Sequence, residues 1–263
     1  MPAPGGGISL LKLARSGVAL LALCGCGEAT SPAREELADP GPIDATRDGA
    51  LSFDGVDDYA SIGTARMPQI ERDQSLMLLF KAEGKRAGGP DVQVLFSLRR
   101  GQGSGIVLAL DRDVPLAYNV WGERDLARAQ APVSLGVWHQ LAFVAQDDSC
   151  TLYIDGAVVA SSTGALSTNR TPIQGTIGSV DGYERMFHGT LDELRVYDRA
   201  FSIEEIDAVD AGMAPADAEQ LVLYLPFNEA SGARSYDRSG LDNHAELGDG
   251  VPELMPRRVA AER

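Results

Sequence analysis

Cysteines and aromatic residues are scarce in this chain of 263 residues. Aromatic side chains make up 6% of it, and of its three cysteines two stand near the N-terminus, at Cys24 and Cys26. Three cysteines cannot form the disulfide framework that holds many small secreted domains together. The chain is nevertheless 44% hydrophobic, which is enough for an ordinary folded core.

Positive charge is also in short supply. Lys and Arg number 23 against 38 Asp and Glu, a formal net charge of −15. A surface this acidic repels phosphate backbones, so we expect no nucleic-acid partner. Carboxylates suit oxygen-binding cations, above all Ca²⁺. The sequence also lacks a glycine-rich phosphate loop, a zinc-ligand spacing and a Ser-His-Asp context.

The apolar run near the N-terminus is too short to cross a bilayer, which takes about 20 apolar residues. Residues 16–23 (SGVALLAL) follow Lys12 and Arg15 and have the length of the apolar core of a secretory signal. The run ends in Leu23-Cys24-Gly25-Cys26, which resembles the bacterial lipoprotein signal. The resemblance implies a signal peptide over residues 1–25 and lipidation of Cys26. The alternative is a soluble secreted protein with incidental cysteines.

A lipidated Cys26 implies a membrane partner. Two or more acyl chains make a stable anchor where one is marginal. Proteins of this type that stay at the inner membrane often carry Asp after the cysteine, whereas this chain has Gly27. We therefore expect a bacterial cell-envelope protein at the outer membrane. Residues 26–48 show no apolar period and are expected to form a flexible tether.

From Gly49 onward the chain consists of short alternating or apolar runs separated by Gly, Asp and Pro. Such a series predicts an all-β fold, an antiparallel β-sandwich, over residues 49–250, with residues 251–263 as a tail. Asp155-Gly156 between two β-type runs is the best hairpin signal in the chain. Residues 202–206 open with Ser202 and carry Glu205 three positions later, a capping box that predicts one short helix.

Four blocks of sequence resemble the laminin-G-like, concanavalin A-like jelly rolls. They are residues 51–59 (LSFDGVDDY), the pair 138–144 (WHQLAFV) and 152–156 (LYIDG), residues 189–200 (GTLDELRVYDRA), and the short helix at 202–206. They occur in the order of that family and span roughly residues 49–208. The resemblance implies a jelly roll of the lectin and glucanase type.

One block is out of family order. Residues 223–229 (LYLPFNE) with 236–244 (YDRSGLDNH) resemble the family's first strand and loop, yet follow the helix. A permuted chain, in which this late strand fills the empty first-strand position, is favoured because sandwich termini often lie close together. The alternative is a second, truncated domain.

A calcium site is predicted at the closing strand. Alternation places Asp192 on the face of Leu194 and Val196, so Asp192 is expected to point into the core, where a carboxylate needs a partner or a metal. The resemblance implies a structural calcium between the first-strand loop and the closing strand. Asp192, Asp237 and Asn243 are the predicted ligands, with Asp57 as a further candidate. The alternative is that these residues form Asx-turns with their own backbone.

Four aromatic residues can stack on sugar rings. Tyr183 and Trp121 are the predicted ligand-binding residues, because both lie in expected loops; Tyr118 is a weaker candidate and Trp138 is expected in the core. The run from Glu205 to Asp210 superficially resembles the catalytic acids of glucanases. It lies in the predicted helix, however, where residues two apart do not share a face.

These expectations favour a non-enzymatic binding module that recognises a polysaccharide or another protein. Fold analogy carries most of this interpretation, and fold alone does not determine function. Two alternatives stay open: a glucanase-type glycoside hydrolase, and a structural envelope protein without a small ligand.

Overall fold

The structure, a computed structural model, describes residues 48–63, 66–67, 73–100, 104–119, 124–163, 174–210 and 220–262. All of them belong to one compact unit, residues 40–263. The predicted signal peptide, Cys26, nearly all of the predicted tether and Trp121 lie outside the described residues. Within the described part of the chain, no helix combines the length and the apolar character that crossing a membrane requires.

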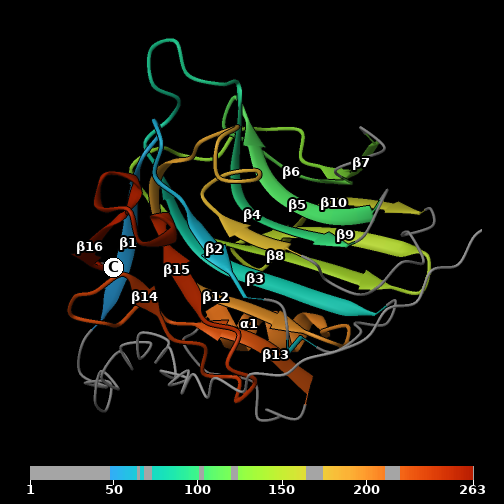
Figure 1. The fold of residues 1–263 in the computed structure, drawn as a ribbon. Coiled ribbons are helices and arrows are strands. Elements are labelled where there is room, and N and C mark those ends of the chain that lie inside the picture. The colour runs from blue at the N-terminus through green and yellow to red at the C-terminus, as the bar shows by residue number, and fades with distance from the viewer. Residues whose placement is uncertain are drawn as a thin grey trace, which may run out of the picture. The chain divides into compact units, whose positions relative to one another are not determined.

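Two antiparallel sheets make up the domain (Figure 1). The first sheet has the order β10-β9-β8-β3-β12-β1-β16, with β13 beside β12. Its strands are β1 (Gly49–Asp54), β3 (Gln74–Ala82), β8 (Trp138–Gln146), β9 (Ser149–Ile154), β10 (Ala157–Thr163), β12 (His188–Tyr197), β13 (Leu221–Leu225) and β16 (Arg257–Ala260).

The second sheet has the order β14-β15-β2-β11-β4-β5-β6-β7. Its strands are β2 (Ala60–Ile62), β4 (Val92–Arg100), β5 (Ser104–Asp111), β6 (Val114–Asn119), β7 (Arg124–Arg128), β11 (Gln174–Ile177), β14 (Arg234–Ser235) and β15 (Ala245–Leu247). The short helices are α1 (Ile203–Asp210) and the 3₁₀ turns η2 (Gly248–Gly250) and η3 (Pro252–Leu254).

The main core lies between the two sheets and draws on both of them. In β9, for example, Cys150, Leu152 and Ile154 alternate with more exposed neighbours and face this core. Six of the seven phenylalanines are almost completely buried and therefore serve packing: Phe53, Phe80, Phe96, Phe143, Phe187 and Phe227. The predicted all-β jelly-roll sandwich is confirmed.

Two local predictions are confirmed in detail. Asp155 and Gly156 both have positive φ, 50° and 74°, as a two-residue turn between β9 and β10 requires. At the start of α1, Ser202 N–H donates to Glu205 Oε2 at 2.9 Å, and Glu205 N–H donates to Ser202 Oγ at 3.4 Å. The helix covers the outer face of the first sheet, where Ile206 is fully buried beside Met77 and Tyr197.

The late segment completes the same sandwich. β3 pairs with one edge of β12. β1 and β13 both pair with the opposite edge, β1 at Leu51↔Leu191 and β13 at Leu194↔Leu225. β15 joins the second sheet through β2. The late strands therefore belong to the same two sheets as the rest of the domain, and the permuted order of the chain stays a prediction.

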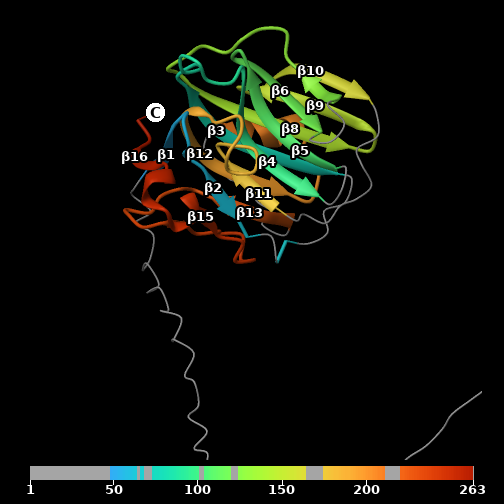
Figure 2. The same ribbon diagram turned by 45° about the horizontal axis from the view of Figure 1, so that its top comes forward.

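The domain also extends beyond the expected boundary at residue 250. Residues 251–263 were expected to be a tail, but β16 pairs with β1 along Gly49↔Ala260 to Ser52↔Arg257. Figure 2 shows β16 alongside β1, so the first and last described strands are neighbours. The alternation of β16 is weak, with two exposed and two half-buried residues, which explains why its sequence does not reveal it.

Candidate functional site

An apolar patch lies on the outer face of the second sheet, away from the main core. Val94, Val107, Ala109, Leu116 and Tyr118 form it, together with Val180. In β5 the neighbours of these outward residues, Ile106, Leu108 and Leu110, face the core, so this strand is apolar on both sides. A strand with two apolar faces needs cover on both of them.

The loop of residues 178–187 supplies part of that cover. It is anchored at both ends: Gly178 N–H donates to Leu95 O at 3.0 Å, and Phe187 N–H donates to Gly178 O at 2.8 Å. Its middle is tied down where Val94 N–H donates to Arg185 O at 2.8 Å. The loop thereby places Val180 on the apolar patch and its charged residues along the rim.

A pocket of about 370 Å³ lies between this loop and the outer face of the sheet. That volume falls in the range of small-molecule sites. The lining combines apolar residues from the patch with charged residues from β4, β7 and the loop: Val92, Arg99, Leu116, Tyr118, Asp125, Arg128, Val180, Asp181, Glu184 and Arg185. We call it the sheet pocket.

Ion pairs hold most of the charged rim in place. Arg99 pairs with Asp181, and both side chains are largely buried. Arg128 Nε lies 2.6 Å from Asp125 Oδ2, and its Nη1 lies 2.9 Å from Asp111 Oδ2. Paired guanidinium and carboxylate groups of this kind present fixed donors and acceptors beside an apolar floor.

Arg185 differs from the other two arginines. Its Nη1 donates to Tyr118 Oη, and its guanidinium lies 5.3 Å from the centroid of the Tyr118 ring. No carboxylate of a described residue lies within 4.0 Å of this guanidinium. Burial raises the pKa of Tyr118 above its ordinary value, so the phenol stays protonated and can donate its hydrogen to a further partner.

A second hollow of about 470 Å³ adjoins the sheet pocket. It lies between the β1–β2, β3–β4 and 178–187 loops and shares Arg185 with the sheet pocket. Its lining is Gly55, Val56, Arg86, Ala87, Gly88, Gly89, Pro90, Tyr183, Arg185 and Met186. We call it the rim hollow.

The structure places one of the two predicted ligand-binding aromatics at these cavities. Tyr183 is 70% exposed and lines the rim hollow. Trp121 lies outside the described residues. Tyr118, the weaker candidate, forms part of the floor of the sheet pocket. Contact of these rings with a ligand stays a prediction.

The predicted metal ligands fall into separate places. Asp237 and Asn243 are in contact, because Asn243 N–H donates to Asp237 Oδ2 at 3.0 Å. The Asp237 carboxylate also accepts hydrogen bonds from Tyr224 N–H, Ser239 N–H and Ser239 O–H. The bond from Ser239 N–H is the Asx-turn that the alternative interpretation expected. A calcium at Asp237 stays a prediction.

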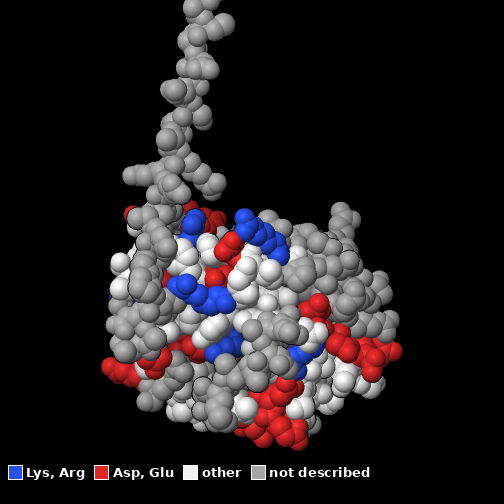
Figure 3. Space-filling view, turned by 90° about the horizontal axis from the view of Figure 1, so that it is seen from below, with Lys and Arg blue, Asp and Glu red and all other residues white. Residues whose placement is uncertain are grey.

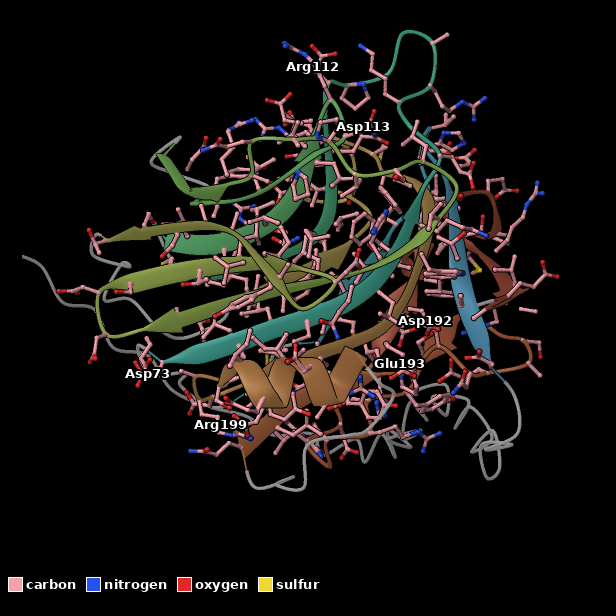
Figure 4. The ribbon with its side chains drawn as sticks, turned by 180° about the vertical axis from the view of Figure 1, so that it is seen from behind. Asp73, Arg112, Asp113, Asp192, Glu193 and Arg199 are labelled. Atoms are coloured by element: carbon pink, nitrogen blue, oxygen red, sulfur yellow. The ribbon has the colours of Figure 1, made fainter. Side chains whose placement is uncertain are left out.

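The expected orientation of Asp192 is wrong. A β-bulge interrupts β12 between Asp192 and Arg195, and Glu193 has φ of 55°. Leu191 and Leu194 both face the core, and Asp192 pairs with Leu79 on the opposite face of the first sheet. Asp192 is fully buried there, next to Glu193 (Figure 4), and its Oδ1 accepts the Glu193 N–H at 2.7 Å. Simple alternation fails because the bulge adds one residue.

Asp57 belongs to an acidic cluster in the β1–β2 loop. One carboxylate oxygen from each of Asp54, Asp57 and Asp58 lies within 4.8 Å of the others. Burial, helped by the nearby carboxylates of Asp54 and Asp57, raises the pKa of Asp58 to about 6, although a hydrogen bond from Asp54 N–H opposes the shift. Exposed acidic groups of this kind are common without a metal, so this cluster does not by itself establish a calcium site.

Sequence reasoning missed the arginines of the sheet pocket. Arg99, Arg128 and Arg185 lie far apart in the chain, and only the sheet pairing and the 178–187 loop bring them together. A usable signal did exist in residues 106–110 (IVLAL), which are apolar at every position. That run indicates a strand buried on both faces, and therefore a covered outer face.

Comparison with known proteins gives one family and several similar folds. A family model described as the concanavalin A-like lectin/glucanases superfamily matches residues 54–207. A protein from Bacteroides ovatus ATCC 8483, named for a proposed carbohydrate-binding role, aligns with a TM-score of 0.62 at 17% identity. The alignment covers 82% of this chain and 61% of the Bacteroides protein.

A second similar structure is a heptameric SAP-like pentraxin from Limulus polyphemus. It aligns with a TM-score of 0.51 at 14% identity, over 80% of this chain and 97% of the pentraxin. At these identities the likenesses show a shared fold and nothing more specific. The present chain spans less than two thirds of the Bacteroides protein.

Proposed function

Because the chain belongs to the concanavalin A-like lectin/glucanase superfamily, we propose that its sandwich is a non-catalytic carbohydrate-binding module with the sheet pocket as its sugar site. The observation that carries this proposal is the pocket lining. An apolar floor at Leu116 and Tyr118 suits the C–H face of a sugar ring, and the ion-paired rim suits its hydroxyl groups. Fold alone would not support this conclusion.

The acidic residues of α1 support a non-catalytic role. A glycoside hydrolase needs two carboxyl groups on either side of the scissile bond. Glu205 instead lies in α1, where its carboxylate contacts Arg199 Nη2 at 2.6 Å and accepts the Ser202 N–H. In the sheet pocket, Asp125 and Asp181 are each bound to an arginine. Release of reducing sugar by the protein in an assay on a polysaccharide panel would contradict the proposal.

The lipid anchor and the calcium predicted from the sequence belong to the same proposal. A lipidated Cys26 would hold the sugar site at a bacterial outer membrane, at the cell surface or in the periplasm, connected by the intervening residues. A calcium ion would stabilise the loops without touching the sugar. Both are supported by sequence patterns, and each is tested separately below.

Substitution of Arg128 by Gln tests the site directly. Arg128→Gln removes the charge that pairs with Asp111 and holds Asp125 at the rim, so we expect sugar binding to weaken about tenfold. Arg234→Gln is the matched control, because Arg234 pairs with Glu246 at the other end of the same sheet and is similarly exposed. Glycan-array screening of the full chain, followed by calorimetry, is the measurement. Equal losses in both variants would overturn the assignment.

A further inference from the structure

The rim hollow has an unusual charge for this molecule. The chain carries a formal net charge of −15, and acidic side chains form several patches on the face shown in Figure 3. The lining of the rim hollow nevertheless contains two arginines, Arg86 and Arg185, and no carboxylate. In an acidic protein such a spot favours an anionic group of a ligand.

Among the described residues, Arg185 has no ion-pair partner, and the one ion pair of Arg86 is long. Arg86 donates to the backbone oxygen of Asp54 at 2.8 Å, while the Asp54 carboxylate lies 3.8 Å away and is not part of the lining. Among the described residues, Arg185 donates its side-chain hydrogen bond to the neutral Tyr118 hydroxyl. Both guanidinium groups therefore keep donors for an oxyanion.

Arg185 also links the rim hollow to the sheet pocket, since it lines both. Its φ of 57° is a left-handed conformation that residues other than glycine rarely adopt. The surrounding loop holds it there through the bond from Val94 N–H to Arg185 O. Such a conformation persists only where neighbouring structure enforces it, and it is often found at ligand sites.

Tyr183 completes the rim hollow. The residue is 70% exposed, and its flat ring lines the same hollow as Arg185, two positions later in the chain. Exposed aromatic rings of this kind pack against apolar faces of ligands while their hydroxyl stays in water. The rim hollow therefore offers a stacking surface next to two cations.

We infer that the two cavities form one groove for an acidic polysaccharide, with one sugar unit in the sheet pocket and a carboxylate- or sulfate-bearing unit between Arg86, Arg185 and Tyr183. This inference rests on the proposed function and adds the charge and the minimum length of the ligand. A single neutral sugar in the sheet pocket would leave Arg86 and Tyr183 of the rim hollow unused. An acidic chain of two or more units occupies both.

Screening of the full chain on an array of neutral, uronic-acid and sulfated polysaccharides is the first test. We expect acidic polysaccharides to bind, and their binding to weaken between 0.1 and 1 M NaCl, where the screening length falls from about 10 to about 3 Å. Binding of neutral polysaccharides alone would overturn this inference and leave the proposed function standing. Binding of no polysaccharide would overturn both.

Three variants test the residues, with the acidic polysaccharide bound in the array as the probe. Arg185→Gln and Arg86→Gln should each weaken binding of the acidic probe about tenfold and flatten its salt dependence. Arg238→Gln is the matched control: Arg238 is exposed, stacks 5.9 Å from the Tyr236 ring and lines neither cavity. It should bind as the unmodified chain does.

A merely structural role of the rim-hollow arginines gives a different result. Arg86 lines the rim hollow and not the sheet pocket, so it separates the two roles. If Arg86 only holds the loops, Arg86→Gln will weaken a carboxyl-reduced or desulfated, neutral form of the same polysaccharide by the same factor as the acidic form, and that outcome would overturn the inference. A loss confined to the acidic form, with an unchanged melting temperature, would support it.

Discussion

At the scale of single residues, one buried ion pair fastens the C-terminus to the rest of the domain. Arg258 Nη1 lies 2.9 Å from Glu229 Oε2, and the two side chains are 8% and 5% exposed. Arg258 also donates to Arg234 O, and Glu229 also accepts the Tyr236 N–H. Removal of the Arg258 guanidinium therefore leaves the Glu229 carboxylate charged and buried without its ion-pair partner.

We therefore predict that Arg258→Met destabilises the domain by about 3–5 kcal/mol. Urea unfolding of the full chain measures it. Arg112→Gln is the control: Arg112 lies at the exposed β5–β6 turn (Figure 4) and pairs with Asp91 at 3.3 Å, so its loss should cost less than about 1 kcal/mol. Similar values for the two variants would show that the Glu229–Arg258 pair contributes no more than a surface pair.

Asp58 gives a prediction about pH. Its pKa in the folded domain is about 6, above the ordinary value of 3.8, so the folded state holds this proton more tightly than the unfolded chain. The contribution of Asp58 to stability is therefore complete below about pH 4 and is lost as the pH rises to about 6. We expect Asp58→Asn, measured with a chelator, to raise the melting temperature at pH 7 and to change it little at pH 4.

Calcium reverses the expectation for the same variant. If a calcium ion binds at Asp54, Asp57 and Asp58, added calcium will raise the melting temperature of the unmodified chain at pH 7, and Asp58→Asn will abolish that rise. Asp237→Asn distinguishes this cluster from the site predicted at Asp237: the variant should keep the calcium-induced rise in melting temperature if the ion binds at the cluster. If calcium added after chelation leaves the melting temperature unchanged, the metal prediction for Asp57, Asp192, Asp237 and Asn243 is wrong.

At the scale of elements, the domain depends on strands from both ends of the chain. β13 and β1 share one edge of β12, β15 extends the second sheet beside β2, and β16 covers the outer edge of β1. Loss of these strands would leave unpaired strand edges and would remove the buried Leu223, Leu225 and Phe227 from the core. The late segment is thus part of the core.

Deletion of residues 218–263 should therefore unfold the domain. We expect the near-ultraviolet circular dichroism and the cooperative melting transition to disappear. The shorter deletion of residues 257–263, which removes β16 but retains β13 and β15, should lower the melting temperature without abolishing the transition. An unchanged melting temperature after the longer deletion would contradict the pairing described for β13.

At the scale of the whole molecule, the predicted anchor decides where the binding module works. Cys26→Ser should release the protein from the membrane fraction of a bacterial host into the soluble fraction, because the predicted acyl chains are attached at Cys26 and Cys24 fits the lipoprotein signal less well. Glycan binding by the released protein should be unchanged, since the sheet pocket and the rim hollow lie within residues 55–186. Membrane association that survives the substitution would contradict the lipoprotein prediction.

Much of the fold follows from local sequence. The turn at Asp155-Gly156, the capping box at Ser202 and Glu205, and the alternation of Cys150, Leu152 and Ile154 are short-range patterns, and each forms as predicted. These patterns are readable because turn chemistry, capping and the two-residue period act between neighbours in the chain. The family blocks supplied the order of the strands.

Other features required the tertiary structure. Asp192 changes faces because one extra residue at Glu193 bulges β12, and β16 pairs with β1 although its own pattern is weak. The sheet pocket and the rim hollow exist because the 178–187 loop folds over β4 and carries Arg185 between them. The turns and the succession of short strands follow from the amino-acid sequence alone, because turn chemistry and the two-residue period act between neighbouring residues. The resemblance to the family supplied the jelly-roll sandwich. The sheet pocket and the rim hollow required the folded chain, since their charged residues come from strands and loops far apart in sequence.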